Sequence, residues 1–244
     1  MQSAPVLRSE WLKIRTTRSL LGVLLALFAV TTAFSALAAA SDPPDLSDPD
    51  FDPLSTAFTG VMPGQIAAIS FGAMAVSSEF HNGALRVSLA AVPQRGRWFA
   101  AKVTSIAVPA LVVGLLTSLA ALLAARAGLG SAADGLTAGE QMRAVAGCAV
   151  YLTLTALFAA GLATLLRSGV ATLSLLIPFI LVVSFVIGDA AGPVVDFMPD
   201  RAGQLVLQQT HEGTLGPWSG LAVTALWTAA ALLAGAWRLH RRDA

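Results

Sequence analysis

VTSIAVPALVVGLLTSLAALLAA, residues 103–125, contains no charged residue and no histidine over 23 positions. A helix of about 20 apolar residues crosses the roughly 30 Å hydrocarbon core of a bilayer, so this stretch is long enough to be a membrane span. The whole chain suits that environment, because 56% of its 244 residues are hydrophobic, 12% are charged and its mean hydropathy is +0.73. We therefore expect an integral membrane protein.

Five further uncharged stretches of similar length predict the other spans. The six predicted spans are residues 19–40, 61–77, 103–125, 144–166, 168–188 and 218–237. Transmembrane barrels use strands of about ten residues with alternating polarity, whereas these runs have the length of helices. We expect an all-α fold with one six-span domain over residues 19–244, in which Pro178 kinks the fifth helix.

The basic residues predict the orientation. With both termini in the cytoplasm, 12 of the 15 arginine and lysine residues lie inside and 11 of the 14 acidic residues lie outside. The positive-inside rule favours this arrangement over its inverse, and we expect a multi-pass protein of the cell (plasma) membrane. The predicted outer loop 189–217 is interpreted either as a surface loop or, preferably, as two short helices that return toward the membrane.

Residues 1–18 predict an amphipathic helix ahead of the first span. Its apolar face consists of Ala4, Leu7, Trp11 and Ile14, while Arg8, Glu10, Lys13 and Arg15 are expected elsewhere on the helix surface. Such a helix lies along the inner membrane interface. The alternative is a basic flank that only fixes the topology.

Residues 78–102 form the largest predicted inner loop. Asn82 is a suitable N-cap, and a helix following it would place Leu85, Leu89 and Val92 on one face. This apolar stripe predicts either a docking helix or a basic connector whose stripe rests on lipid. Residues 95–97 are expected to turn the chain into the third span.

Motifs for chemistry are missing from the sequence. It has no G-x-x-x-x-G-K-[ST] and no H-E-x-x-H, and its three histidines fall outside the predicted spans. The aspartates of residues 42–53 lack the spacing of an EF-hand, and the single Cys148 lies in an apolar run. We expect no enzyme activity, metal site or cofactor in this chain. Spans without ionisable groups also disfavour an ion-coupled carrier.

A family resemblance adds to this interpretation. The pattern E-x-x-x-G-x-L-R-x-x-L-x-x-x-P-x-R-x-x-x-x-x-A-K over residues 79–102 resembles the cytoplasmic loop between spans two and three of type 2 ABC transporter permeases. SEWLKIRTTRS resembles that family's interfacial helix, and LGPWSGL with the final RRDA resembles its last span and tail. The resemblance covers essentially the whole chain, but Ala84 stands where the family has threonine.

The resemblance implies a permease subunit of an exporter of drugs, antibiotics, lipids or glycans. It would pair with a second permease, identical or related, and with two copies of a separate ATPase that binds ATP and Mg. The implied coupling helix would enter an ATPase groove. The residues implied at that contact are Glu79, Gly83, Leu85, Arg86, Leu89, Pro93 and Arg95, with Leu7, Glu10, Trp11 and Ile14 on the interfacial helix. The alternatives are a non-transporting immunity or sensor subunit and, third, an ion-coupled carrier.

Overall fold

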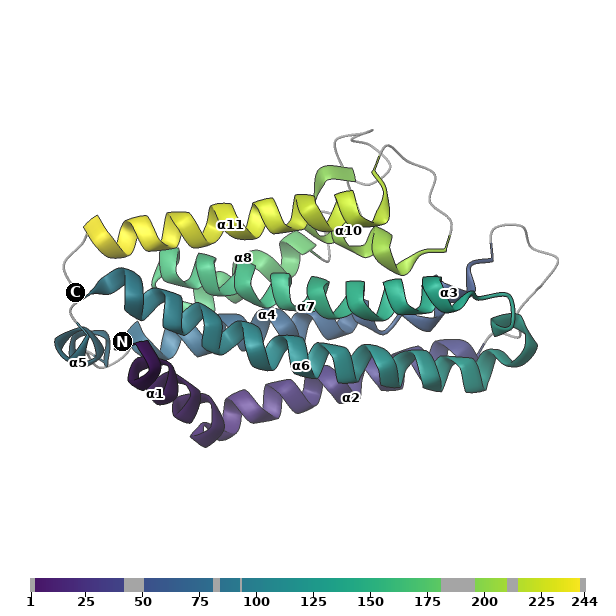
Figure 1. Ribbon diagram of the computed structural model, residues 1–244, viewed down its shortest axis with the longest axis horizontal. Helices are drawn as coiled ribbons and strands as arrows, with labels where there is room; N and C mark the ends of the chain where they lie inside the picture. Colours follow the sequence, from purple (N-terminus) through teal and green to yellow (C-terminus); the bar gives the residue numbers. More distant parts are fainter. Residues whose placement is uncertain are drawn as a thin grey trace.

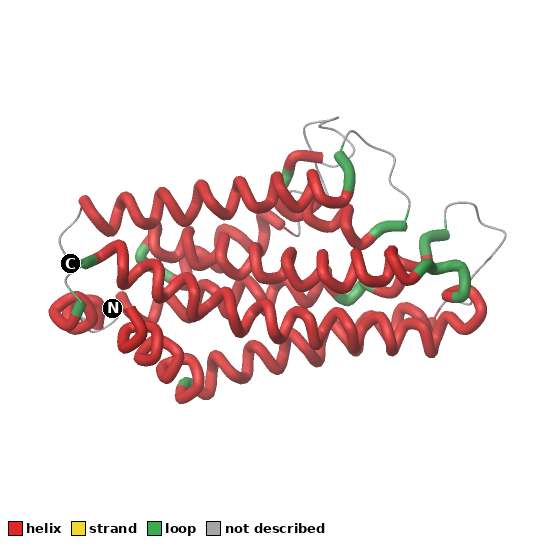
Figure 2. Tube along the Cα trace, viewed as in Figure 1, coloured by secondary structure: helices red, strands yellow, loops and turns green. Residues whose placement is uncertain are grey.

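The computed structural model describes residues 3–41, 51–80, 84–92, 94–180, 196–209 and 215–241. All regular secondary structure in these ranges is helical, as Figure 2 shows. Asn82, Gly83, Pro93 and the predicted outer segments 42–50, 189–195 and 210–214 lie outside the described residues.

Five helices of the described chain are long and apolar enough to cross a membrane. They are α2 (Arg18–Ser41), α4 (Val61–Ser77, continued by the 3-10 turn η1, Ser78–Phe80), α6 (Arg95–Leu129), α7 (Ala138–Leu166) and α11 (Pro217–Arg241). The shorter elements are α1 (Ser3–Thr16), α3 (Pro53–Ala57), α5 (Ala84–Ala91), η2 (Gly130–Ala133), α8 (Gly169–Pro178), α10 (Pro199–Gln204) and η5 (Leu205–Leu207). The prediction of an all-α multi-pass membrane protein agrees with this architecture.

The order of contacts along α7 and α11 fixes their relative direction. Thr228 of α11 donates a hydrogen bond to the Leu154 carbonyl, and Gly235 lies against Gly161 further along both helices. The two helices therefore run in the same direction, and the chain has to return between them. The helix α8 begins this return, but the predicted fifth span 168–188 is described only to residue 180. The count of six spans stays a prediction.

Small residues let the helices approach closely. A methyl group built on Gly72 of α4 would overlap the Ala156 carbonyl of α7, and one on Gly64 would overlap Thr31 of α2. Close backbone contact is the usual source of helix association in lipid, where the hydrophobic effect between helices is weak. Gly64 and Gly72 therefore let α4 pack closely against α2 and α7.

The start of α6 differs from the prediction. The helix α6 has 35 residues and begins at Arg95, so residues 95–97 form its first turn rather than a reversal of the chain. At 1.5 Å per residue α6 is roughly 50 Å long and extends beyond a bilayer core. The charged residues before position 103 therefore indicate where the helix is expected to leave the membrane core, and they do not indicate where α6 begins. Arg167 has φ 55° and forms the tight turn that separates α7 from α8.

Both α1 and the C-terminal end of α11 lie at one end of the bundle, which we call the terminus end (Figure 1). At the opposite end, α10 and η5 pack beside α11. Trp227 donates a hydrogen bond to the Phe197 carbonyl, and Thr224 donates one to the Pro199 carbonyl. Trp227 is ten residues into α11, a distance of about 15 Å along its axis. The described part of the predicted outer loop therefore returns alongside the bundle.

Candidate functional site

The terminus end brings α1, α5, the start of α6 and the end of α11 together (Figure 1). The apolar stripe of α5 faces this assembly. Leu85 is buried against a cluster that includes Trp98, Phe99 and Leu239, and Leu89 and Val92 pack against the same cluster. The long α6 supplies Trp98 and Phe99, which makes its first turns the platform on which α5 rests.

This packing corrects the expectation for the stripe. Leu85 and Leu89 were expected to fill a groove on a partner, or alternatively to rest on lipid, but the chain's own residues already cover Leu85 and partly cover Leu89. The free face of α5 is the opposite one. It contains the exposed Arg86 and Val87, the latter 73% exposed, with Ala90 and Ala91.

Four charged side chains form an ion cluster beneath α5. Glu10 of α1, Glu79 of η1 and Lys102 of α6 are each at most 3% exposed. The Lys102 Nζ lies 2.7 Å from the Glu79 Oε1 and also pairs with Glu10, while the Lys13 Nζ lies 2.8 Å from both carboxylates. Three elements distant in sequence are therefore joined by buried charge.

The burial of Glu10 corrects a second expectation. Glu10 was expected on the polar surface of α1, yet it faces the bundle together with Ile14. Leu7 and Trp11, which were placed on one apolar face with Ile14, are 39% and 37% exposed. Ile14 is thus buried against the bundle, whereas more than a third of the Leu7 and Trp11 side-chain surface stays exposed.

The ion cluster is electrically balanced, with two carboxylates and two ammonium groups. Burying a charge costs several kcal/mol unless it is well paired, so each group depends on its neighbours. Partial burial alone would lower the pKa of Lys13, but hydrogen bonds from its ammonium to Glu10 and Glu79 and their negative charge outweigh that effect and raise its pKa. Lys13 therefore stays charged at neutral pH.

Ser88 connects α5 to the ion cluster. Its hydroxyl donates a hydrogen bond to the Glu79 Oε2 at 3.1 Å and accepts one from the Lys13 Nζ at 3.4 Å. Arg95 makes a second connection at this end, since its Nη1 donates to the Leu239 carbonyl at 2.7 Å. A cation at the C-terminal end of α11 satisfies a free carbonyl and complements the helix dipole. Arg95 thus joins α6 to α11.

A groove of about 530 Å³ runs between α1 and the junction of α5 with α6. Its lining consists of Pro5, Val6, Ser9, Ala91, Val92, Gln94 and Arg97. The exposed side of α5 reaches this groove through Ala91. The terminus end therefore offers a surface with a raised helix on one side and a hollow beside it.

The structure brings together some of the residues singled out in the sequence. Glu79 and Glu10 meet in the ion cluster, whereas Gly83 and Pro93 are not described. The sequence did not predict that Lys13, Lys102 and Ser88 contact these carboxylates. The sequence did contain a signal for these pairs. Only three of the 14 acidic residues are predicted on the inner side, among many basic residues, and Glu10 and Glu79 are two of these three.

The ion cluster and the packing of α5 hold four helical elements in fixed positions. Within the described ranges, no group of three or more histidine, cysteine or acidic residues is placed to hold a metal ion. In comparisons with known proteins, no family model and no curated protein matches the chain.

Proposed function

We propose that this chain is the permease subunit of an ATP-binding cassette exporter, driven by a separate ATPase that docks at the terminus end. The observation that carries the proposal is α5 itself, a short helix with a buried inner face, an exposed outer face and a hydrogen bond into the ion cluster. A helix held in this way can receive a contact on one face and pass its displacement to the bundle through the other.

The route of that displacement is short. A push on α5 would act through Leu85 on Trp98 of α6, and through Ser88 on Glu79 at the end of α4. Packed cores and buried ion pairs resist independent sliding of their members, so these contacts favour joint movement of α4 and α6. Movement of spans against one another is what an ATP-driven permease needs.

The terminus end faces the cytoplasm of a cell whose plasma membrane holds the protein, as the excess of basic residues on that side supports. ATP and Mg bind to the ATPase, and a second permease chain, identical or related, completes the pathway. These features follow from the sequence resemblance, which remains the source of the transporter assignment.

A pair of matched substitutions tests the docking surface. Val87→Asp places a carboxylate on the exposed face of α5, where an apolar contact with the ATPase would have to bury it. Met142→Asp is the control. Met142 is 73% exposed, as Val87 is, and it lies near the start of α7 at the opposite end of the bundle. We expect Val87→Asp to reduce the amount of ABC ATPase that co-purifies from native membranes by at least about tenfold, as for a buried unpaired charge.

The measurement is quantitative mass spectrometry of protein purified in mild detergent at matched expression. Equal ATPase recovery with Val87→Asp and Met142→Asp would contradict the proposed surface. Normal docking without ATP-dependent export by reconstituted vesicles would favour the non-transporting immunity or sensor subunit instead.

A further inference from the structure

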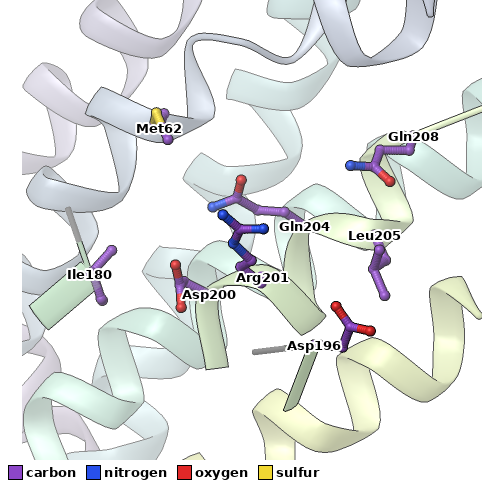
Figure 3. A pocket seen from close by; sticks show the side chains of 8 residues that line it. All are labelled: Met62, Ile180, Asp196, Asp200, Arg201, Gln204, Leu205 and Gln208. Atoms are coloured by element: carbon purple, nitrogen blue, oxygen red, sulfur yellow. The ribbon is translucent and has the colours of Figure 1, made fainter. Parts of the chain in front are cut away.

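A pocket of about 350 Å³ lies at the opposite end of the bundle, where α10 returns beside α11. Figure 3 shows side chains from α4, α10 and the adjoining segments directed around it. The lining residues are Met62, Ile180, Asp196, Asp200, Arg201, Gln204, Leu205 and Gln208. This volume is within the range of small-molecule sites.

The charged residues of the lining differ in burial, and the acidic ones are more buried than the basic one. Asp200 is 5% exposed and Asp196 is half-buried, whereas Arg201 is exposed. Among the lining residues that the structure describes, two carboxylates outnumber one guanidinium, and the most buried charge is negative. Coulombic attraction strengthens as the surroundings become less polar, so a cation inside the pocket would be favoured over an anion.

One wall is braced by a chain of buried polar groups. The Tyr151 hydroxyl donates to the Gln65 Oε1 at 2.5 Å and accepts from the Gln204 Nε2 at 3.3 Å. Tyr151 and Gln65 are each 1% exposed, so α7 and α4 hold the Gln204 side chain in place. A wall fixed before a ligand arrives reduces the entropic cost of binding.

The other walls are apolar. Met62 lies in the first turn of α4. Together with Ile180 and Leu205 it forms the apolar part of the lining around the carboxylates. We propose that this pocket binds an organic cation, a protonated amine carried on an apolar body. The ammonium group would face Asp200 and Asp196, and the apolar body would contact Met62, Ile180 and Leu205.

This inference goes beyond the proposed function, because the pocket is remote from α5 and binding to it needs no ATPase. It is tested on the purified full-length chain by isothermal titration calorimetry with three probes of one skeleton, phenylbutylamine, phenylbutanol and phenylbutyrate. Titrations into detergent alone remove the contribution of partitioning. We expect saturable binding of the amine, binding of the alcohol weaker by about tenfold or more, and no binding of the carboxylate.

Substitutions assign the binding to this pocket. Asp200→Asn keeps the size of the side chain and removes its charge, and we expect it to weaken amine binding by about tenfold. Asp196→Asn provides a second test at a less buried position, should the first variant fail to fold. Asp134→Asn removes an exposed carboxylate from the turn before α7, outside the pocket, and should leave binding unchanged.

The outcomes are distinguishable from those of the docking experiment. Absence of saturable amine binding, equal binding of the three probes, preference for the carboxylate, or unchanged binding in every folded pocket variant would each overturn the inference. None of these results would affect ATPase recovery with Val87→Asp.

Discussion

Lys102 is the residue on which the ion cluster depends most. Its ammonium contacts both buried carboxylates, and its Nζ also lies 5.8 Å from the centroid of the Trp98 ring. Buried ion pairs contribute little net stability relative to apolar residues of similar size, but removing one partner leaves an uncompensated charge. The cluster therefore specifies the position of α1 more than it stabilises the bundle.

The first residue-scale prediction compares the two lysines. Lys102→Met should lower the free energy of unfolding by about 3 kcal/mol, because Glu10 and Glu79 stay buried with only Lys13 to compensate them. Lys13→Met should cost about 1 kcal/mol or less, since the Lys13 side chain is 43% exposed and solvent screens its charge. Chemical denaturation in mild detergent measures both losses.

A double variant serves as the control. Lys102→Met combined with Glu79→Gln removes one charge of each sign and should recover part of the lost stability. Equal losses for the two single lysine variants would show that the cluster is less buried in solution than the structure has it.

At the scale of elements, the contact between α4 and α7 shows how small residues set helix spacing. Gly72→Ala should lower the free energy of unfolding by about 2 kcal/mol, because its methyl group would overlap the Ala156 carbonyl and separate the helices. Gly22→Ala in α2 is the matched control, with nothing within 4 Å of the added methyl group. It should be neutral or stabilise by up to about 1 kcal/mol through helix propensity.

Thermal unfolding of the two alanine variants, followed by circular dichroism, compares them directly. If Gly72→Ala were as stable as Gly22→Ala, close packing of α4 on α7 would not be needed for the fold.

The elements also show what the sequence could predict. Uncharged runs predicted the apolar helices, because a charge is costly in hydrocarbon. They did not predict where α6 begins, since the polar stretch from Arg95 to Lys102 continues the helix outside the expected membrane core. The period of Leu85, Leu89 and Val92 predicted a stripe on α5, but a period says nothing of which surface covers the stripe.

The pocket was missed for a related reason. The predicted spans contain no charged residue, so no span pointed to a charged pocket. Asp200 belongs to the predicted outer loop, and only the return of α10 beside α11 brings its carboxylate into the bundle. Contacts between segments distant in sequence, such as Gln204 with Tyr151, leave no local pattern.

At the scale of the whole molecule, the parallel course of α7 and α11 supports an even number of crossings. Single cysteines at Gln94 and Gly135, in a chain with Cys148→Ala, test the orientation that the basic residues predict. Both positions are exposed. We expect an impermeant thiol reagent added to intact cells to label position 135 and not position 94. Labelling of position 94 alone would reverse the orientation.

The central claim is that an ABC ATPase docks on the exposed face of α5, and a photo-crosslinking amino acid at position 87 tests it most directly. The same amino acid at position 135 provides the control in living cells, and mass spectrometry identifies the adducts. We predict that illumination links position 87, but not position 135, to a protein with an ATP-binding cassette. Adducts of position 87 that contain only lipid or other proteins, with no ABC ATPase among them, would contradict the account.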